Sequence, residues 1–279
     1  MSEIFGGGIR GYREFLMRTE GAADPVRFQL VERERFFAAF ESTRPRARYA
    51  ADRDVFLESL RARRATPGLD PRMLWLVATA KLNQAERFGV GLGEVYGKEQ
   101  DKFEAEPERL YVQLQEHYHT RILADVISMF GLPFPVVPPR PALRATIRLL
   151  VALPGEWTLP LVAASEVVAC VLFCAMREEG LRLFADDPPV AELIARLYGE
   201  IIADEVGHVG FAAAKLSPRW RSFSRFLARS IAWRSIVASV PEIVALLGKT
   251  ELRRLLHERF DVEHIVQTFG GRAYAAAAL

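Results

Sequence analysis

Apolar residues recur along most of this chain at the three- and four-residue spacing of an amphipathic helix. No stretch shows the strict alternation of apolar and polar positions that is typical of a half-buried strand. Pro and Gly residues separate the helical stretches and mark the turns between them. The predicted helices cover residues 26–40, 51–65, 72–96, 108–130, 142–152, 159–184 and 190–216, with two or three more after Pro218. The pattern therefore predicts an all-α protein.

Four of these helices are long, and the connections between them differ in length. A short turn follows the helix over 72–96, a Pro-rich crossover covers 131–154, and a second short turn lies at 186–189. Helix, short turn, helix, long crossover, helix, short turn, helix is the connectivity of a ferritin-like four-helix bundle. We expect one domain over 1–279, with a bundle at about 70–216, an N-terminal helical extension over 1–69 and C-terminal helices over 217–279.

Composition excludes several classes of protein. The 279 residues are 50% hydrophobic, enough for a sizeable core, and the net charge of +2 is too small to indicate a polyanion as partner. Cys170 and Cys174 lie four apart in an apolar run, which favours buried thiols over a disulfide framework. No run of 18 uncharged apolar residues occurs, and the start has no signal-peptide pattern. We expect a cytoplasmic protein with no membrane partner.

Two Glu-x-x-His pairs carry most of the chemical information. Glu116 and His119 form one pair, and Glu205 and His208 form the other. Residues three apart lie on one face of a helix, so each pair presents a carboxylate and an imidazole to the same side. Two such pairs, with one further carboxylate from each of two other helices, make a dinuclear metal site inside a helical bundle.

The carboxylates that complete such a site must lie at the same level of the bundle. In the second hairpin, Glu166 lies 21 residues before Asp187 at the turn, and Glu205 lies 18 residues after it. At about 1.5 Å per residue these levels agree within about one turn. Glu166 also interrupts an apolar run, where a carboxylate is costly unless it is paired or metal-bound. The rivals, Glu178 and Glu179, lie too close to the turn.

The first hairpin gives the same result. Its turn is expected near Asp101, and Glu86 and Glu116 each lie 15 residues from that point. Glu94 lies only 7 residues before it. The sequence therefore predicts six metal ligands: Glu86, Glu116, His119, Glu166, Glu205 and His208. The other histidines, His117, His257 and His264, are interpreted as flanking, packing or surface residues.

The residue before each ligand glutamate can hold the histidine of the opposite pair. A histidine ligand needs an acceptor for its second ring nitrogen, which fixes the tautomer and raises the basicity of the ligand. We expect Asp204 to hold His119 and Gln115 to hold His208, whereas the alternative for both is a polar residue beside a helix face.

The predicted donors indicate the metal and leave room for a substrate. Two histidines and four carboxylates suit iron or manganese better than zinc or copper. We expect two Fe ions, with Mn/Fe as the alternative. Small or apolar residues near the ligands are expected to line a substrate pocket: Ala169, Cys170, Phe173, Ile201 and Phe211.

These residues resemble the ferritin-like di-iron oxygenases over about residues 70–216. In length and flanking helices the chain is similar to the p-aminobenzoate N-oxygenase group. That group has a third histidine one turn before its last Glu-x-x-His, where this chain has Ile201. The resemblance implies O2 activation, an external electron donor and oxidation of a small organic substrate by N-oxygenation, hydroxylation or desaturation.

Two alternatives stay open from the sequence. A ferritin-type protein would oxidise and bind iron without an organic substrate. An RNA-modifying hydroxylase of the same superfamily would need a basic face, and the near-neutral net charge makes nucleic acid an unexpected partner. The flanking helices are typical of a lid or of a homodimer surface.

Overall fold

The structure, a computed structural model, describes residues 25–96, 107–134 and 155–258, with single helical residues at 10, 14, 17, 145 and 149. Within these ranges every regular element is a helix, which confirms the all-α prediction for the described part of the chain. The predicted helix over 142–152 and the turn near Asp101 lie outside these ranges. The elements are α3 (Pro25–Thr43), α4 (Arg53–Arg61), α5 (Pro71–Tyr96), α7 (Pro107–Ser128), α9 (Gly155–Leu183), α10 (Pro188–Lys215), α11 (Pro218–Leu227), the π-helix η1 (Ala228–Ala232), α12 (Trp233–Ser239), α13 (Pro241–Leu247) and α14 (Lys249–Glu258).

Helix α5 begins where the sequence predicts, whereas α9 begins earlier than predicted. The Asp70 carboxylate accepts hydrogen bonds from the backbone N–H groups of Arg72 and Met73, so it caps α5 as expected from Asp-Pro. The sequence predicted a helix that begins at residue 159, but α9 already begins at Gly155 and includes Pro160. A proline near the start of a helix removes only one backbone hydrogen bond, so the first turn of α9 forms ahead of it.

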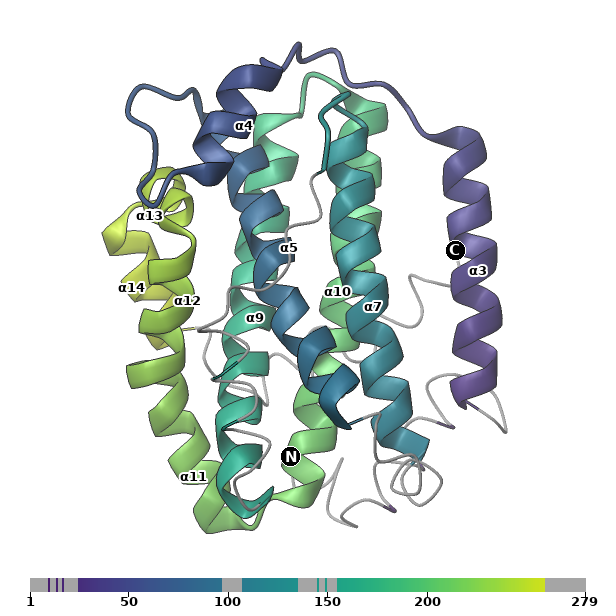
Figure 1. Ribbon diagram of the computed structural model, residues 1–279, viewed down its shortest axis with the longest axis vertical. Helices are drawn as coiled ribbons and strands as arrows, with labels where there is room; N and C mark the ends of the chain where they lie inside the picture. The colour runs from purple at the N-terminus through teal and green to yellow at the C-terminus, as the bar shows by residue number, and fades with distance from the viewer. Residues whose placement is uncertain are drawn as a thin grey trace.

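Four long helices, α5, α7, α9 and α10, lie side by side and are called the central helices below (Figure 1). Helix α9 packs mainly on α10 and α5 mainly on α7, while α10 also packs on α7 and α5 on α9. Each central helix therefore has two neighbours in the group. Their facing sides form one hydrophobic core, which includes Trp75, Ile122, Phe173 and Tyr198.

A close contact fixes the spacing of α5 against α9. The indole Nε1 of Trp75 donates a hydrogen bond to the backbone carbonyl of Met176 at 2.8 Å. A Cβ atom at Gly180 would lie 2.7 Å from Cζ2 of Trp75, so only glycine leaves space for the ring there.

The outer helices cover two sides of the central helices (Figure 1). Helix α3 packs on α7, whereas α11, η1, α12 and α13 pack on α9 and α5. A buried ion pair attaches α13, because Nζ of Lys81 on α5 lies 2.6 Å from Oε1 of Glu242.

One helix of the described ranges is apolar and long enough to cross a membrane, over Trp157–Leu183 of α9, but 67% of that window is buried inside the protein. The region Pro218–Leu247 passes the same test only as a pair of helices that bend by 93°.

Candidate metal centre

The six predicted ligands come together from all four central helices. Helix α5 supplies Glu86, α7 supplies Glu116 and His119, α9 supplies Glu166, and α10 supplies Glu205 and His208. Five of the six residues are buried, and the side chain of Glu166 is the most accessible at 17%. Glu86 and Glu166, which were predicted from their distance to the turn of each helix pair, therefore lie in one cluster with the two Glu-x-x-His pairs.

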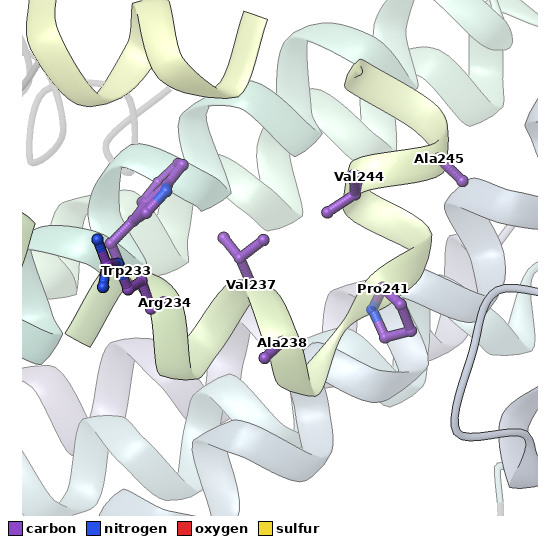
Figure 2. A pocket seen from close by; sticks show the side chains of 7 residues that line it. All are labelled: Trp233, Arg234, Val237, Ala238, Pro241, Val244 and Ala245. Carbon is purple, nitrogen blue, oxygen red and sulfur yellow. The ribbon is translucent and has the colours of Figure 1, made fainter. Parts of the chain in front are cut away.

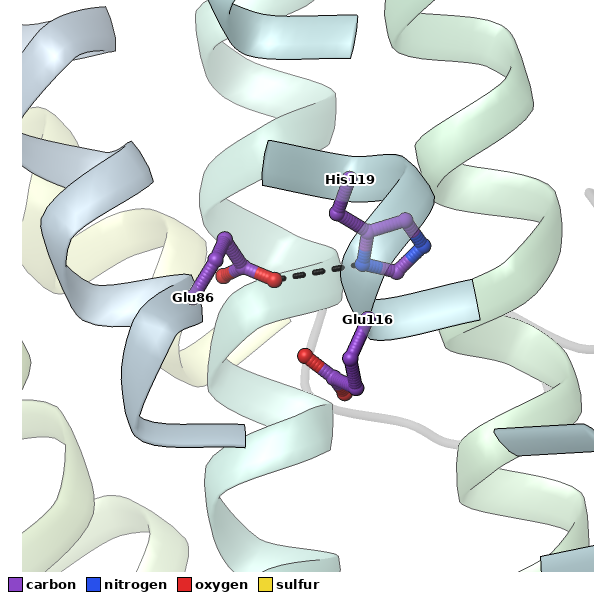
Figure 3. Close-up of side chains that lie close together, drawn as sticks. All are labelled: Glu86, Glu116 and His119. Carbon is purple, nitrogen blue, oxygen red and sulfur yellow. Dashed lines mark hydrogen bonds and ion pairs between the residues drawn. The ribbon is translucent and has the colours of Figure 1, made fainter. Parts of the chain in front are cut away.

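The first group of donors lies between α5 and α7. Oε2 of Glu86 lies 3.1 Å from Nδ1 of His119, and Glu116 projects toward the same space from one turn earlier on α7 (Figure 3). One ligand atom from each of the three lies within 4.8 Å of the others, an arrangement that can hold a metal ion.

The second group lies between α7, α9 and α10. Glu116, Glu166 and His208 again offer ligand atoms within 4.8 Å of one another. Oε2 of Glu166 lies 3.2 Å from Nδ1 of His208. Glu116 belongs to both groups, so the groups adjoin, and the two imidazole centroids are 5.5 Å apart.

Each Glu-x-x-His glutamate reaches the histidine of the opposite pair. Oε1 of Glu116 lies 3.3 Å from Nδ1 of His208, and Oε1 of Glu205 lies 3.3 Å from Nδ1 of His119. The other oxygen, Oε2 of Glu205, is 3.9 Å from Nδ1 of His208. Glu116 and Glu205 therefore occupy the centre of the cluster, where a carboxylate can be shared by two cations.

The second nitrogen of each histidine meets the residue expected from the sequence. Nε2 of His119 lies 3.2 Å from Oδ2 of Asp204, and Nε2 of His208 lies 3.1 Å from Oε1 of Gln115. Nε2 of Gln115 donates to Oδ1 of Asp204 at 2.8 Å. Because both acceptors face Nε2, a neutral histidine carries its proton there and presents the Nδ1 lone pair to the carboxylates.

One residue of this network was missed by the sequence reasoning. Arg33 on α3 is buried, contacts Oδ1 of Asp204 and lies 2.8 Å from Oε2 of Glu200. The missed signal was its spacing, because Arg33 shares the buried face of α3 with Phe37 and Phe40, four and seven residues later. An arginine on an apolar helix face needs a buried acid as partner.

Burial and crowding of acids shift the pKa values within the cluster. Burial raises the pKa of Glu86 to about 7, and the charges of Glu116 and Glu166 add to the rise. Burial, with the charge of Glu166, raises the pKa of Glu205 well above its usual range. Burial opposes ionisation of Glu166 as well, but the hydrogen bond and charge of His208, with smaller contributions from Glu205 and His119, together outweigh burial and lower that pKa.

The pKa of each histidine is also raised, although burial alone would lower it. Contacts with Asp204, Glu205 and Glu86 raise the pKa of His119, and contacts with Glu116 and Glu166 raise that of His208. Without cations, Glu86, Glu205 and both imidazoles therefore hold protons more tightly than the free groups would. Metal ions compete with protons for such donors, so their binding releases protons.

The donor set fits metal cations, because the buried glutamates offer negative charge and the histidines offer neutral nitrogen donors. Oε2 of Glu205 is buried and has no hydrogen-bond partner within the described ranges. An unsatisfied buried carboxylate oxygen is costly, and a cation within the cluster would satisfy it.

The residues predicted to line a substrate pocket lie around α9 and α10. Cys170, Phe173 and Ile201 are fully buried core residues, and Phe173 packs against Tyr198 with ring centroids 6.1 Å apart. Ala169 is partly buried, and the ring of Phe211 lies under the Lys215 ammonium. Their role in holding a substrate stays a prediction. His117 is exposed, as expected of a flanking residue, whereas the His257 side chain and His264 lie outside what the structure describes.

No protein-family model, curated protein or solved structure matches the chain.

Proposed function

We propose that this protein is a ferritin-like oxidoreductase that uses O2 at a dinuclear metal site, with two iron ions or one manganese and one iron, to oxidise a small organic substrate. One observation carries the proposal: both histidines turn Nδ1 to shared carboxylates while Asp204 and Gln115 hold both Nε2 atoms. A packed hydrophobic core has no need of this arrangement, whereas a metal site requires it.

The residues have distinct parts in such a site. Glu86, Glu116 and His119 would hold one ion, and Glu166, Glu205 and His208 the other, with Glu116 and Glu205 shared between them. The central helices supply all six ligands, four of them as two carboxylate–imidazole pairs at i and i+3, which supports the assignment to a ferritin-like four-helix bundle.

Two ferrous ions bound there would supply the two electrons needed to begin reduction of O2. One oxygen atom then enters the substrate and the other leaves as water, so two electrons and two protons per turnover come from an external donor. The protein keeps the cluster dry on the α3, α7 and α10 sides, where His119, Asp204 and Glu205 are fully buried. The side chain of Glu166 is the most accessible ligand, so we assign the approach of O2 and substrate to the α9 side.

The decisive experiment is stoichiometric loading followed by O2 uptake. The protein is loaded anaerobically with two equivalents of Fe(II), exposed to O2, and screened with arylamines, aromatic acids and fatty acids. We expect substrate-dependent O2 uptake and one atom of labelled oxygen in the product. His119→Ala should abolish both, while His117→Ala, which changes an exposed neighbour, should leave both unchanged.

Other results would favour the competing functions. Many irons bound per chain, with O2 uptake that ignores every substrate, would support an iron-oxidising ferritin-type protein. Turnover on tRNA but on none of the small molecules would support an RNA-modifying hydroxylase.

A further inference from the structure

Residues 206–241 form an uninterrupted basic stretch. They contain Lys215 and five arginines but no aspartate or glutamate. The remaining 243 residues carry 31 basic and 35 acidic side chains, so the positive excess of the whole chain lies in this stretch. The net charge of +2 for the whole chain, which argued against a charged partner, does not reveal this uneven distribution of charge.

The same stretch exposes apolar side chains. Phe226 is 61% exposed and Ile231 55%, and Trp157 at the start of α9 is 53% exposed. Trp157, Trp220, Phe223 and Phe226 form a continuous row, with successive ring centroids 5.5, 5.6 and 6.4 Å apart. We call Trp157, Trp220, Phe223, Phe226 and Ile231 the aromatic face.

Exposed arginines border the aromatic face. Arg219, Arg225, Arg229 and Arg234 are all exposed on α11, η1 and α12. Arg221 differs, because its Nε donates to the backbone carbonyls of Ala213 and Leu216 and so ties α11 to the end of α10. Apolar rings and basic groups therefore both reach the surface of these helices.

An apolar groove lies further along the chain, beyond η1. It has a volume of about 530 Å³ and lies on α12 and α13 (Figure 2). Its lining residues are Trp233, Arg234, Val237, Ala238, Pro241, Val244 and Ala245. Arg234, one of the exposed arginines named above, is the one charged residue among them.

We propose that the aromatic face and this groove form a docking surface for an anionic lipid bilayer. Arginines beside exposed aromatic and aliphatic side chains are the combination by which amphipathic helices bind at the level of lipid headgroups. Helices α11, η1 and α12 carry arginines and meet α13 at a bend of 93°, which favours lying on a membrane over spanning it. This proposal departs from the sequence-based expectation of no membrane partner.

Charge and shape favour lipid over the other occupants. A second copy of the chain would bring two sets of arginines together without an acid between residues 206 and 241 to pair with them. RNA would match the arginines and the aromatic rings, but it would leave the aliphatic side chains of Ile231, Val237 and Val244 uncovered. An anionic bilayer satisfies both the charges and the apolar side chains.

The test is co-sedimentation of the full chain with lipid vesicles. Vesicles of phosphatidylcholine with about one-third phosphatidylglycerol should bind the protein, pure phosphatidylcholine should bind it far less, and added salt should weaken the binding. Arg219→Ala/Arg225→Ala should weaken binding by about fivefold for each arginine removed. Phe226→Ser/Ile231→Ser should weaken it by about tenfold or more, because both apolar side chains stay in water.

Matched controls separate this surface from general charge and hydrophobicity. Arg63→Ala/Arg64→Ala removes two exposed arginines elsewhere, and Val31→Ser removes an exposed apolar residue of α3. Both should bind vesicles as the parent does. Vesicles should also shift the tryptophan emission of the parent to the blue, and Trp157→Phe should reduce that shift.

Three results would overturn the proposal. The first is no binding to anionic vesicles, or equal losses in the test and control variants. The second is a dimer in solution that Phe226→Ser/Ile231→Ser dissociates, which would assign the surface to a second copy. The third is tight tRNA binding without vesicle binding. None of these depends on the metal centre, so the proposed oxygenase function stands or fails separately.

Discussion

The guanidinium of Arg33 contacts the carboxylate of Asp204 across 171 residues of sequence. The other oxygen of Asp204 lies 3.2 Å from Nε2 of His119, whose Nδ1 faces Glu86 and Glu205. Helix α3 of the N-terminal extension is thus connected to the cluster by two successive contacts, from Arg33 to Asp204 and from Asp204 to His119. Docking of α3 and the orientation of His119 depend on the same carboxylate.

Replacing Arg33 should therefore destabilise the fold and loosen the metal site together. Arg33→Met leaves Asp204 and Glu200 buried without their cation, and breaking a buried pair in this way costs about 3–5 kcal/mol. Arg35→Met on the same helix changes an exposed residue paired with Glu32 and should cost less than about 0.5 kcal/mol. Urea unfolding measures both, and a loss of stability in Arg33→Met no larger than in Arg35→Met would remove Arg33 from the network.

Asp204 and Glu200 offer a matched comparison, because both contact Arg33 but only Asp204 contacts His119. Asp204→Ala should weaken metal binding by about 10–100-fold, the usual effect of losing the acceptor behind a histidine ligand. Glu200→Ala should leave metal affinity within a few-fold of the parent. Competition with a chelator after iron loading gives both affinities, and equal affinity in the two variants would show that Asp204 acts only through Arg33.

Helical periodicity and Glu-x-x-His spacing allowed much of the site to be predicted. Glu86 and Glu166 were selected by distance from a turn, because antiparallel helices place equidistant residues at one level. The role of Arg33 could not be predicted, because no spacing rule relates a residue of α3 to a residue of α10. The contact between Arg33 and Asp204 depends on how α3 packs against the central helices. The pattern predicted a helix start at residue 159, yet α9 begins four residues earlier, at Gly155.

The buried pair between Lys81 and Glu242 gives a test of how α13 is attached. Lys81 also donates to the backbone carbonyl of Ala62 at 2.9 Å, so this one ammonium joins three segments. Lys81→Met should cost about 3–5 kcal/mol because it leaves Glu242 buried and charged. Adding Glu242→Leu should recover most of that loss, since the double variant leaves no charge behind. A double variant as unstable as the sum of the single ones would show that the pair is not coupled.

Asp125 should make stability depend on pH. Burial raises its pKa to about 6, and its Oδ2 is buried without a hydrogen-bond partner among the residues described. The folded state therefore holds this proton more tightly than the unfolded chain, whose aspartates titrate near pH 3.9. The stability cost is absent below about pH 4, grows as the pH rises and is complete above about pH 6.

Asp125→Asn removes that cost, so it should stabilise the protein by about 1–2 kcal/mol above pH 6, allowing for partial exposure, and by little below pH 4. Thermal unfolding at pH 4, 5, 6 and 7.5 gives the difference from the parent at each pH. Glu192→Gln, at an exposed position of α10, serves as the control and should show no such trend. A gain for Asp125→Asn that is equal at all four values would contradict the assigned pKa.

The number of metal ions bound per chain tests the central claim most directly. Titration with Fe(II) under anaerobic conditions, followed by elemental analysis, should give about two ions per chain for the parent. Glu166→Ala should bind about one, because Glu166 belongs to only one of the two donor groups. Glu179→Ala, which removes a carboxylate of the same helix that is hydrogen-bonded to Arg182, should still bind two. A parent protein that binds one ion or none, or a Glu166→Ala variant that keeps both, would contradict the dinuclear site.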